Sequence, residues 1–275
     1  MSKCPYLYLS IPLYVVFKKF IIVYIMKEIK NNSISLQQPN WTCDGFHKDV
    51  PNPMPQSISF FMIIVGSPGS GKSSLGINLL CNKGKNKIYR KKYNWVYLFC
   101  PENSLNSLKN NPFKNLPDEQ IFHEFDLDNL LILIDTLETN AQQDETSLIF
   151  IDDLASSLKD GGKEVLNLFL RLVFNRRHLK CAIVLAVQRL YTIPKSVRSV
   201  ATDIILFPPS NKVEKQIIFN EYIPIGWNNF RELSKFAWRD GEKHSTLYHK
   251  INTNDFYRNF NKIEFTDEEH DKFFG

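Results

Sequence analysis

The fold of this chain is decided by one stretch of its sequence, Gly66-Ser67-Pro68-Gly69-Ser70-Gly71-Lys72-Ser73. The stretch matches the pattern G-x-x-x-x-G-K-[S/T] at every fixed position. The apolar segment 59–65 before it predicts a buried strand, and segment 74–80 after it predicts a helix. Because the pattern binds phosphate only between a strand and a helix, this context predicts a phosphate-binding loop at residues 66–73.

The chemistry of this loop points to a nucleoside triphosphate. Glycines let the backbone turn so that successive N–H groups face one phosphate, and the helix N-terminus adds partial positive charge. We expect Lys72 to reach the β- and γ-phosphates of ATP, and the Ser73 hydroxyl to bind Mg²⁺. The predicted nucleotide-binding residues are Gly66, Ser67, Pro68, Gly69, Ser70, Gly71, Lys72, Ser73 and Ser74.

A second apolar segment, residues 148–151, ends in the acidic pair Asp152 and Asp153. This is the form of a Walker B strand, which buries its apolar body and presents carboxylates at the carboxyl edge of the sheet. We predict that Asp152 belongs to the Mg²⁺ shell. Asp153 is then expected to orient or deprotonate the attacking water.

Two further candidates follow from the segments after Walker B. The predicted strand 182–186 leads to Gln188, which would contact the γ-phosphate as a sensor if this strand lies between the other two. Arg176 and Arg177 follow a predicted helix and are candidates for an arginine finger, with Arg177 ahead of Arg176. The alternative for both arginines is a solvated helix C-terminus, which also favours positive charge.

The order of the segments predicts the architecture. Strands expected near residues 59–65, 95–100, 148–151, 182–186 and 204–207 alternate with helices. This alternation predicts an α/β protein, a P-loop NTPase of the additional-strand type, with a parallel five-stranded core sheet and helices on both faces. We divide the chain into an N-terminal segment (1–57), a P-loop ATPase core (58–222) and a mainly helical appendage (223–275), with a short strand at 246–248.

The composition limits the partners and the cellular compartment that we expect for this chain. The 275 residues carry a net charge of +5, which permits an anionic partner without demanding one. The five cysteines are scattered and form no C-x-x-C pair. We therefore expect a reducing compartment, no disulfide framework and no zinc site.

The N-terminal segment 6–26 is almost all apolar, but Lys18 and Lys19 lie in its middle and Pro12 interrupts it. Each lysine at mid-membrane costs about 2.5–3.5 kcal/mol on insertion scales. Three interpretations stay open: a membrane anchor, an amphipathic surface segment, or translated sequence upstream of the true start. We hypothesise that the native protein begins at Met26, which a natural N-terminal peptide containing residues 6–18 would contradict.

A longer segment carries a resemblance to a known family. It holds the pair Arg177-His178, an apolar strand ending in Gln188, and then Pro194 and Arg198. With the phosphate-binding loop and the double-Asp Walker B, it resembles the poxvirus-type DNA-packaging ATPases. These belong to the FtsK–HerA superfamily and occur in large DNA viruses, virophages and related elements.

The resemblance covers about residues 57–222. It implies a ring of five or six copies that drives double-stranded DNA into a preformed capsid, with a capsid or portal partner. It also implies action in the host-cell cytoplasm or in the virion, with Gln188 as sensor and Arg176/Arg177 as the finger region. One departure concerns Asp153, where many members have Glu. Asp is one methylene shorter, so the position of the attacking water would shift.

A translocase must grip the phosphate backbone of DNA without reading bases. A basic run with Tyr89 and Tyr93 interleaved is one candidate, and a solvated surface loop is its alternative. A second candidate is the loop 159–163 after Walker B. The predicted DNA contacts in the basic run are Lys83, Lys85, Lys87, Arg90, Lys91 and Lys92.

Other functions compete with a packaging motor. A different P-loop DNA-dependent ATPase or helicase would use the same core. A small-molecule kinase would need an Arg-rich lid. A GTPase-like switch is suggested only by Asn211-Lys212-Val213-Glu214, which partly matches N-K-x-D. A nucleotide-gated structural protein would not need the intact acidic pair.

Overall fold

The computed structural model describes residues 45–84, 87–107, 111–154, 158, 161–239 and 243–265. All of them belong to one compact unit, residues 41–275. The predictions for segment 6–26, for Lys85 and for residues 159–160 lie outside the described residues. Within the described part, no helix is long and apolar enough to cross a bilayer.

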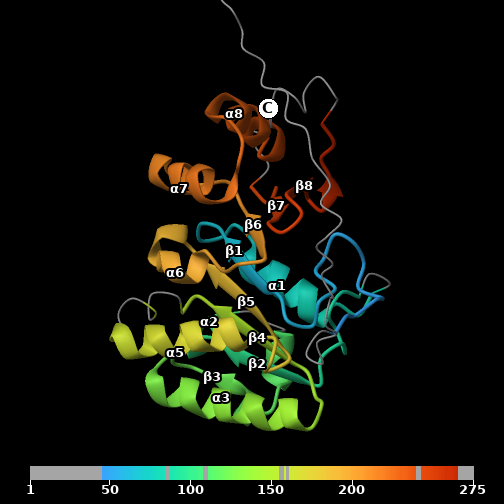
Figure 1. Cartoon of the computed structure of the whole chain (residues 1–275), viewed down its shortest axis with the longest axis vertical. Coiled ribbons are helices and arrows are strands. Elements are labelled where there is room, and N and C mark those ends of the chain that lie inside the picture. The colour runs from blue at the N-terminus through green and yellow to red at the C-terminus, as the bar shows by residue number, and fades with distance from the viewer. Residues whose placement is uncertain are drawn as a thin grey trace, which may run out of the picture. The chain divides into compact units, whose positions relative to one another are not determined.

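One nine-stranded sheet organises the chain, in the order β3-β2-β4-β5-β1-β6-β7-β8-β9 (Figure 1). All neighbours from β3 to β6 are parallel, and β7, β8 and β9 are added antiparallel. The strands are β1 (Phe61–Val65), β2 (Trp95–Phe99), β3 (Ile121–Phe122), β4 (Ser147–Asp152), β5 (Cys181–Val187), β6 (Asp203–Leu206), β7 (Leu247–Lys250), β8 (Asp255–Arg258) and β9 (Asn261–Lys262).

The predicted core sheet is confirmed as β2-β4-β5-β1-β6. Strand β5 pairs with β1 on one side and with β4 on the other. The carboxyl ends of β1, β4 and β5 therefore meet at one edge. This placement brings together the phosphate-binding loop, Walker B and the residue after β5.

The predicted helices near residues 74–80, 127–137 and 165–173 correspond to α1, α3 and α5. Asp126 caps α3 by accepting from the backbone N–H of Asn129 at 2.9 Å. The longer helices are α1 (Lys72–Cys81), α3 (Leu127–Gln142), α5 (Gly162–Asn175), α7 (Lys212–Tyr222) and α8 (Trp227–Ala237). The short ones are α2 (Glu102–Ser107), α6 (Lys195–Arg198), η1 (Pro112–Asn115), η2 (Asp118–Gln120) and η3 (Leu190–Thr192).

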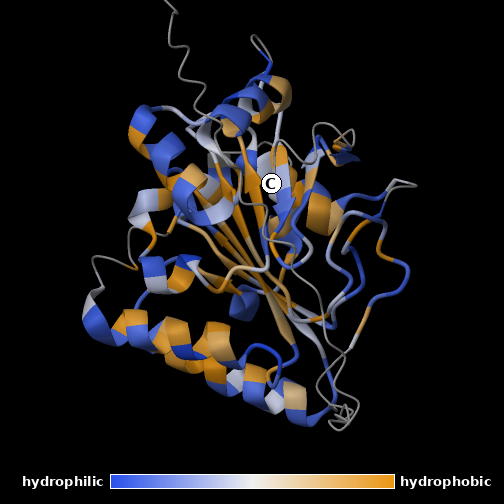
Figure 2. Cartoon of the chain, turned by 45° about the horizontal axis from the view of Figure 1, so that its top comes forward, coloured by the Kyte–Doolittle hydropathy of each residue, from blue (hydrophilic) through white to orange (hydrophobic). Residues whose placement is uncertain are grey.

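Alternating side chains of the strands form two cores, one on each face of the sheet. The central strands carry mostly hydrophobic residues (Figure 2). In β1, Phe61 and Ile63 face α3, α5, α7 and α8, whereas Met62 and Ile64 face α1 and the irregular segments around it. Helices α3 and α5 lie side by side on the first face. The prediction of helices on both faces is confirmed, and the first face carries most of them.

The region after residue 222 differs from the prediction. It holds α8, but three strands follow it, so "mainly helical" was wrong. The short strand expected at 246–248 corresponds to β7, whose Tyr248 hydroxyl donates to Asp203 at 2.6 Å. Strands β8 and β9 were missed because they are too short to show a clear alternating pattern and turn residues separate them. The sheet thus runs across the proposed boundary at 222/223.

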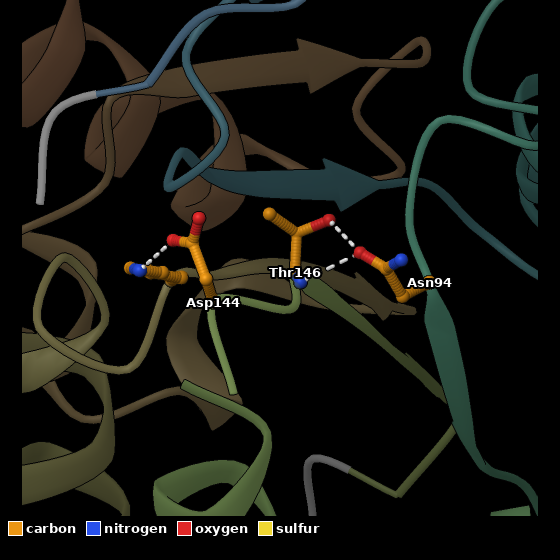
Figure 3. Close-up of polar contacts among 4 residues, drawn as sticks. Asn94, Asp144 and Thr146 are labelled. Carbon is orange, nitrogen blue, oxygen red and sulfur yellow. Dashed lines mark hydrogen bonds and ion pairs between the residues drawn. The ribbon is translucent and has the colours of Figure 1, made fainter. Parts of the chain in front are cut away.

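Polar contacts tie the amino ends of the parallel strands, at the edge opposite the phosphate-binding loop (Figure 3). The Asn94 side-chain carbonyl accepts from the N–H and the hydroxyl of Thr146, at 2.8 and 3.0 Å. Asp144, at a φ of 62°, forms an ion pair with Lys180. These contacts join the residues before β2, β4 and β5, and they favour a single pairing register.

Candidate nucleotide site

The phosphate-binding loop is a tight turn between β1 and α1. The Gly66 N–H donates to the Val187 carbonyl at 3.1 Å, and the Ser70 N–H donates to the Ser67 carbonyl at 3.1 Å. Gly71 has a φ of 106°, a conformation that L side chains rarely adopt, and α1 begins at the next residue. The loop therefore presents the positive end of α1 at the carboxyl edge of the sheet.

Lys72 is held over the loop and faces the acidic pair. Its side-chain ammonium donates to the Ser67 carbonyl at 3.2 Å, and only 7% of the residue is exposed. Burial lowers the pKa of Lys72, while the charges of Asp153 and Asp152 oppose that shift. The ammonium is thus partly desolvated, which strengthens its pull on an arriving phosphate.

Asp152 has the surroundings of a metal ligand. It is 7% exposed, and its Oδ1 has no hydrogen-bond partner within the described part of the chain. Burial raises the pKa of Asp152, whereas the Ser73 hydroxyl and Lys72 act to lower it. Mg²⁺ is bound by one or two carboxylates together with phosphate oxygens, so a buried carboxylate with a spare oxygen beside Ser73 fits it.

Asp153 and Gln188 form a direct link between Walker B and the residue after β5. The Gln188 amide donates to both carboxylate oxygens of Asp153, at 2.7 and 2.9 Å. Asp153 adopts a φ of 59°, and its N–H donates to the Ala186 carbonyl at 3.3 Å. Aspartate tolerates this left-handed conformation better than most residues, and here the Asp153 carboxylate faces Gln188.

A cavity of about 300 Å³ opens beside the loop. It contains three of the predicted residues with catalytic roles, Lys72, Asp153 and Gln188, together with the predicted metal ligand Asp152. The other lining residues are Pro68, Gly69, Ser73, Ser74, Ile77, Leu98, Cys100, Ser104, Asn111 and Phe113. The last six were not predicted. Only Leu98 and Cys100 could have been suspected from the sequence, because they stand at the end of a predicted strand. In the structure this strand, β2, pairs with β4, so its end lies beside the acidic pair.

Two unpredicted residues matter around the loop: Cys100 lines this cavity, and Gly76 lies on α1. Burial and the nearby charges of Asp152 and Asp153 raise the pKa of Cys100 to about 12, so its thiol stays protonated and unreactive. Gly76 lets α1 approach β4 closely, because an added Cβ would lie 2.3 Å from the Phe150 ring. The phosphate-binding helix is thus seated directly on the Walker B strand.

The two finger candidates lie at the opposite edge of the sheet, beyond the end of α5. Arg176 donates to the Ser59 carbonyl at 3.0 Å and to the Val173 carbonyl at 2.8 Å. These contacts give Arg176 a structural task within the chain and count against it as a finger. Arg177 is exposed to solvent. Neither arginine approaches the nucleotide site of its own chain.

Arg198, a position of the family resemblance, is also internal. It is 8% exposed and forms an ion pair with Glu221 at 2.8 Å, and its carbonyl accepts from the Tyr222 hydroxyl at 3.1 Å. Its guanidinium joins the end of α6 to α7. The structure thus gives Arg198 a partner within the chain.

The basic run after α1 is only partly available to a ligand. Tyr89 and Tyr93, which are interleaved in the run, are buried, and their hydroxyls donate to the carbonyls of Pro55 and Ile58. Lys92 forms an ion pair with Asp49. Arg90 is half-buried, and the exposed basic side chains of the described part of the run are Lys83, Lys87 and Lys91.

The segment that partly matches a guanine-reading motif has another role. The Asn211 side chain caps α7 by accepting from the Glu214 N–H at 2.8 Å. Glu214 is 3% exposed and accepts from the Leu190 N–H at 2.5 Å. Both side chains are committed within the chain, which removes the motif as support for a GTPase-like switch.

Comparison with solved structures places the fold. The DNA-packaging ATPase B204 from Sulfolobus Turreted Icosahedral Virus is similar at a TM-score of 0.54 and 16% identity, over 73% of this chain and 96% of that one. The B204 genome packaging NTPase of Sulfolobus turreted icosahedral virus 2, in complex with ATP-gammaS, gives 0.52 and 16%, over 73% and 97%. EssC (ATPases 2 and 3) from Geobacillus thermodenitrificans gives 0.54 and 12%, over 78% and 42%.

At these identities the likeness concerns the fold, and it confirms the predicted P-loop ATPase class. No curated protein matches the chain. One family model does, that of the Poxvirus A32 protein, and it matches residues 55–220, which include the phosphate-binding loop, Walker B and Gln188. The chain therefore belongs to the Poxvirus A32 protein family.

Proposed function

We propose that this protein is an ATP-hydrolysing motor that moves double-stranded DNA into a viral capsid. The observation that carries the proposal is the meeting of Lys72, Asp152, Asp153 and Gln188 in one cavity at the carboxyl edge of the sheet. Family membership and the fold shared with DNA-packaging ATPase B204 support DNA as the load. The site of action would be the place of virion assembly in the host-cell cytoplasm, with a capsid or portal component as partner.

ATP would bind with its phosphates against the loop 66–73. Lys72 would leave the Ser67 carbonyl for the β- and γ-phosphates, while Asp152 and Ser73 hold Mg²⁺. When bound, Mg²⁺ neutralises charge on the phosphate oxygens during transfer. Asp153 would orient the attacking water and accept its proton, for which a carboxylate at the end of β4 is well placed.

The contact between Gln188 and Asp153 would report the state of the nucleotide. In the structure, the Gln188 amide donates to the Asp153 carboxylate. An arriving γ-phosphate offers the same amide a second charged acceptor. Gln188 would then leave Asp153 to the water, and it would return when phosphate departs. This exchange would pass the outcome of hydrolysis to β5 and the segment after it.

Catalysis would also need a second subunit. Arg177 lies at the edge opposite its own nucleotide site, so it can act as a finger only on a neighbour. A closed ring of five or six copies would place such a residue at each interface. The permanent charge and forked geometry of arginine suit the γ-phosphate in the transition state.

Mixing two inactive variants tests this arrangement. We expect Arg177→Ala to lower kcat by about 10³–10⁵-fold, the usual value of an arginine finger. An Arg177→Ala subunit mixed with a Lys72→Ala subunit should regain part of the activity, because one supplies an intact site and the other an intact finger. Phosphate release measured across mixing ratios checks this. Arg171→Ala, an exposed arginine on α5, should keep full activity, and no rescue at any ratio would contradict the geometry.

Duplex DNA tests the proposed load. We expect the ATPase rate to rise on addition of double-stranded DNA of any sequence, with the ring mass measured under the same conditions. A motor that tracks the phosphate backbone has no need of base contacts. An ATPase rate that does not change with DNA would contradict DNA translocation. Faster hydrolysis of GTP than of ATP would favour the GTPase-like alternative.

Charge reversal at the exposed lysines of the basic run tests whether this run contacts DNA. Reversal of Lys83, Lys87 and Lys91 to Glu should weaken DNA binding and make its salt dependence shallower, by about 0.9 in log–log slope for each phosphate that the variant no longer neutralises. Basal ATPase activity should stay unchanged. The control reverses three exposed lysines elsewhere, Lys114, Lys212 and Lys235. An equal slope in both variants would remove the basic run from the DNA path.

A further inference from the structure

A histidine from the C-terminal part of the sheet touches the phosphate-binding loop. His244 lies between α8 and β7, and its Nδ1 is 2.8 Å from the Ser70 carbonyl oxygen. Because a carbonyl only accepts, Nδ1 must carry the hydrogen and donate it. The ring also lies against Gly71, where an added Cβ would be 3.3 Å from Nδ1.

This contact orients the peptide that leads into α1. Among the described residues the only cis peptide is Asn52–Pro53, so the Ser70–Gly71 peptide is trans. In a trans peptide the C=O and the N–H point in opposite directions. Anchoring the Ser70 carbonyl on His244 therefore aims the Gly71 N–H away from His244, toward the concave side of the loop. Gly71 has no side chain that could fix this peptide itself, and its φ of 106° is one of several open to glycine.

The two residues that follow His244 are anchored in the fold, although His244 itself is exposed. The next residue, Ser245, is 2% exposed and its hydroxyl donates to the Ala237 carbonyl at 2.5 Å. The N–H of Thr246 donates to the Asn259 side chain at 2.8 Å. Strand β7 then pairs with β6, directly beside β1. The backbone that carries His244 is thus tied to the same sheet that carries the loop.

We propose that His244 is a positioning residue for the nucleotide, which holds the Ser70–Gly71 peptide with its N–H turned toward the phosphates. The inference rests on the phosphate-binding part of the proposed function, and not on DNA or on packaging. His244 lies beyond the residues 55–220 that match the family model. It gives the turn before β7 a task in the site, since that turn carries the donor to the Ser70 carbonyl.

Binding of ATP and of inorganic tripolyphosphate to the full chain tests this proposal. His244→Ala should raise the Kd of both ligands by about three- to tenfold, the worth of one hydrogen bond, and raise the KM for ATP alike. The kcat should change less than about twofold, because the groups at the γ-phosphate are untouched. His244→Asn should restore both Kd values, since the Asn amide nitrogen occupies the place of Nδ1. His178→Ala, an exposed histidine near the opposite edge, should leave both unchanged.

Comparing ATP with tripolyphosphate shows whether His244 acts on the phosphates or on the nucleoside. Equal binding of both ligands by wild type and His244→Ala would overturn the inference. A loss confined to ATP would also overturn it, because the histidine would then serve the nucleoside and not the phosphates. Failure of His244→Asn to restore binding would do the same. If wild type binds neither ligand, the nucleotide site itself, and with it the proposed function, fails.

Discussion

Lys72→Ala should abolish ATP hydrolysis, with an expected loss in kcat of at least about 10²–10³-fold, the effect of removing one charged donor from a transition state. Lys72 is the buried cation facing the two carboxylates, and its pKa responds to both of them. Without it, Asp152 and Asp153 would repel the γ-phosphate unopposed, so ATP affinity should fall as well. Steady-state phosphate release and calorimetric binding of ATP measure the two effects.

Lys235→Ala is the matched control, because this exposed lysine on α8 pairs only with Glu232 of its own helix in the described structure. It should keep wild-type turnover. Thermal unfolding of Lys72→Ala without ligand checks that the variant is folded, because removing Lys72 leaves the buried Asp152 carboxylate without a nearby positive charge. Normal hydrolysis by a folded Lys72→Ala variant would reject the site.

Asp153→Asn should leave ATP binding intact and lower kcat by about 10²–10⁴-fold, the range of a lost general base. The change removes a charge and a proton acceptor but keeps the shape. Asparagine tolerates the left-handed φ of 59°, and its amide oxygen can still accept from Gln188. Binding of Mg·ATP by calorimetry, beside single-turnover hydrolysis, separates the two steps.

Asp144→Asn provides an unusually close control. Asp144 is also an acidic residue with a left-handed φ, 62°, but it lies at the opposite edge of the sheet beside Lys180. Its replacement should not change kcat. Asp152→Asn, in contrast, should weaken Mg·ATP binding. If Asp153→Asn loses binding in the same way, Asp153 belongs to the metal and another group must act as base.

The sequence by itself determined the parts of this protein whose signals are local. The phosphate-binding loop, the acidic end of β4 and the five parallel strands each show in a few consecutive residues. This is because glycine conformation, apolar runs and helical periods act over short distances. The family resemblance rests on the same local motifs, and the match to residues 55–220 confirms it.

The tertiary structure alone decided which of these parts touch. Gln188 meets Asp153 across 35 residues, Arg176 is bound by Ser59 across 117, and His244 reaches Ser70 across 174. Strand order creates each of these contacts, and pairing between distant strands leaves no periodic trace in either segment. The same holds for β8 and β9, whose short segments become strands because β7 offers an edge to β8 and β8 in turn offers an edge to β9.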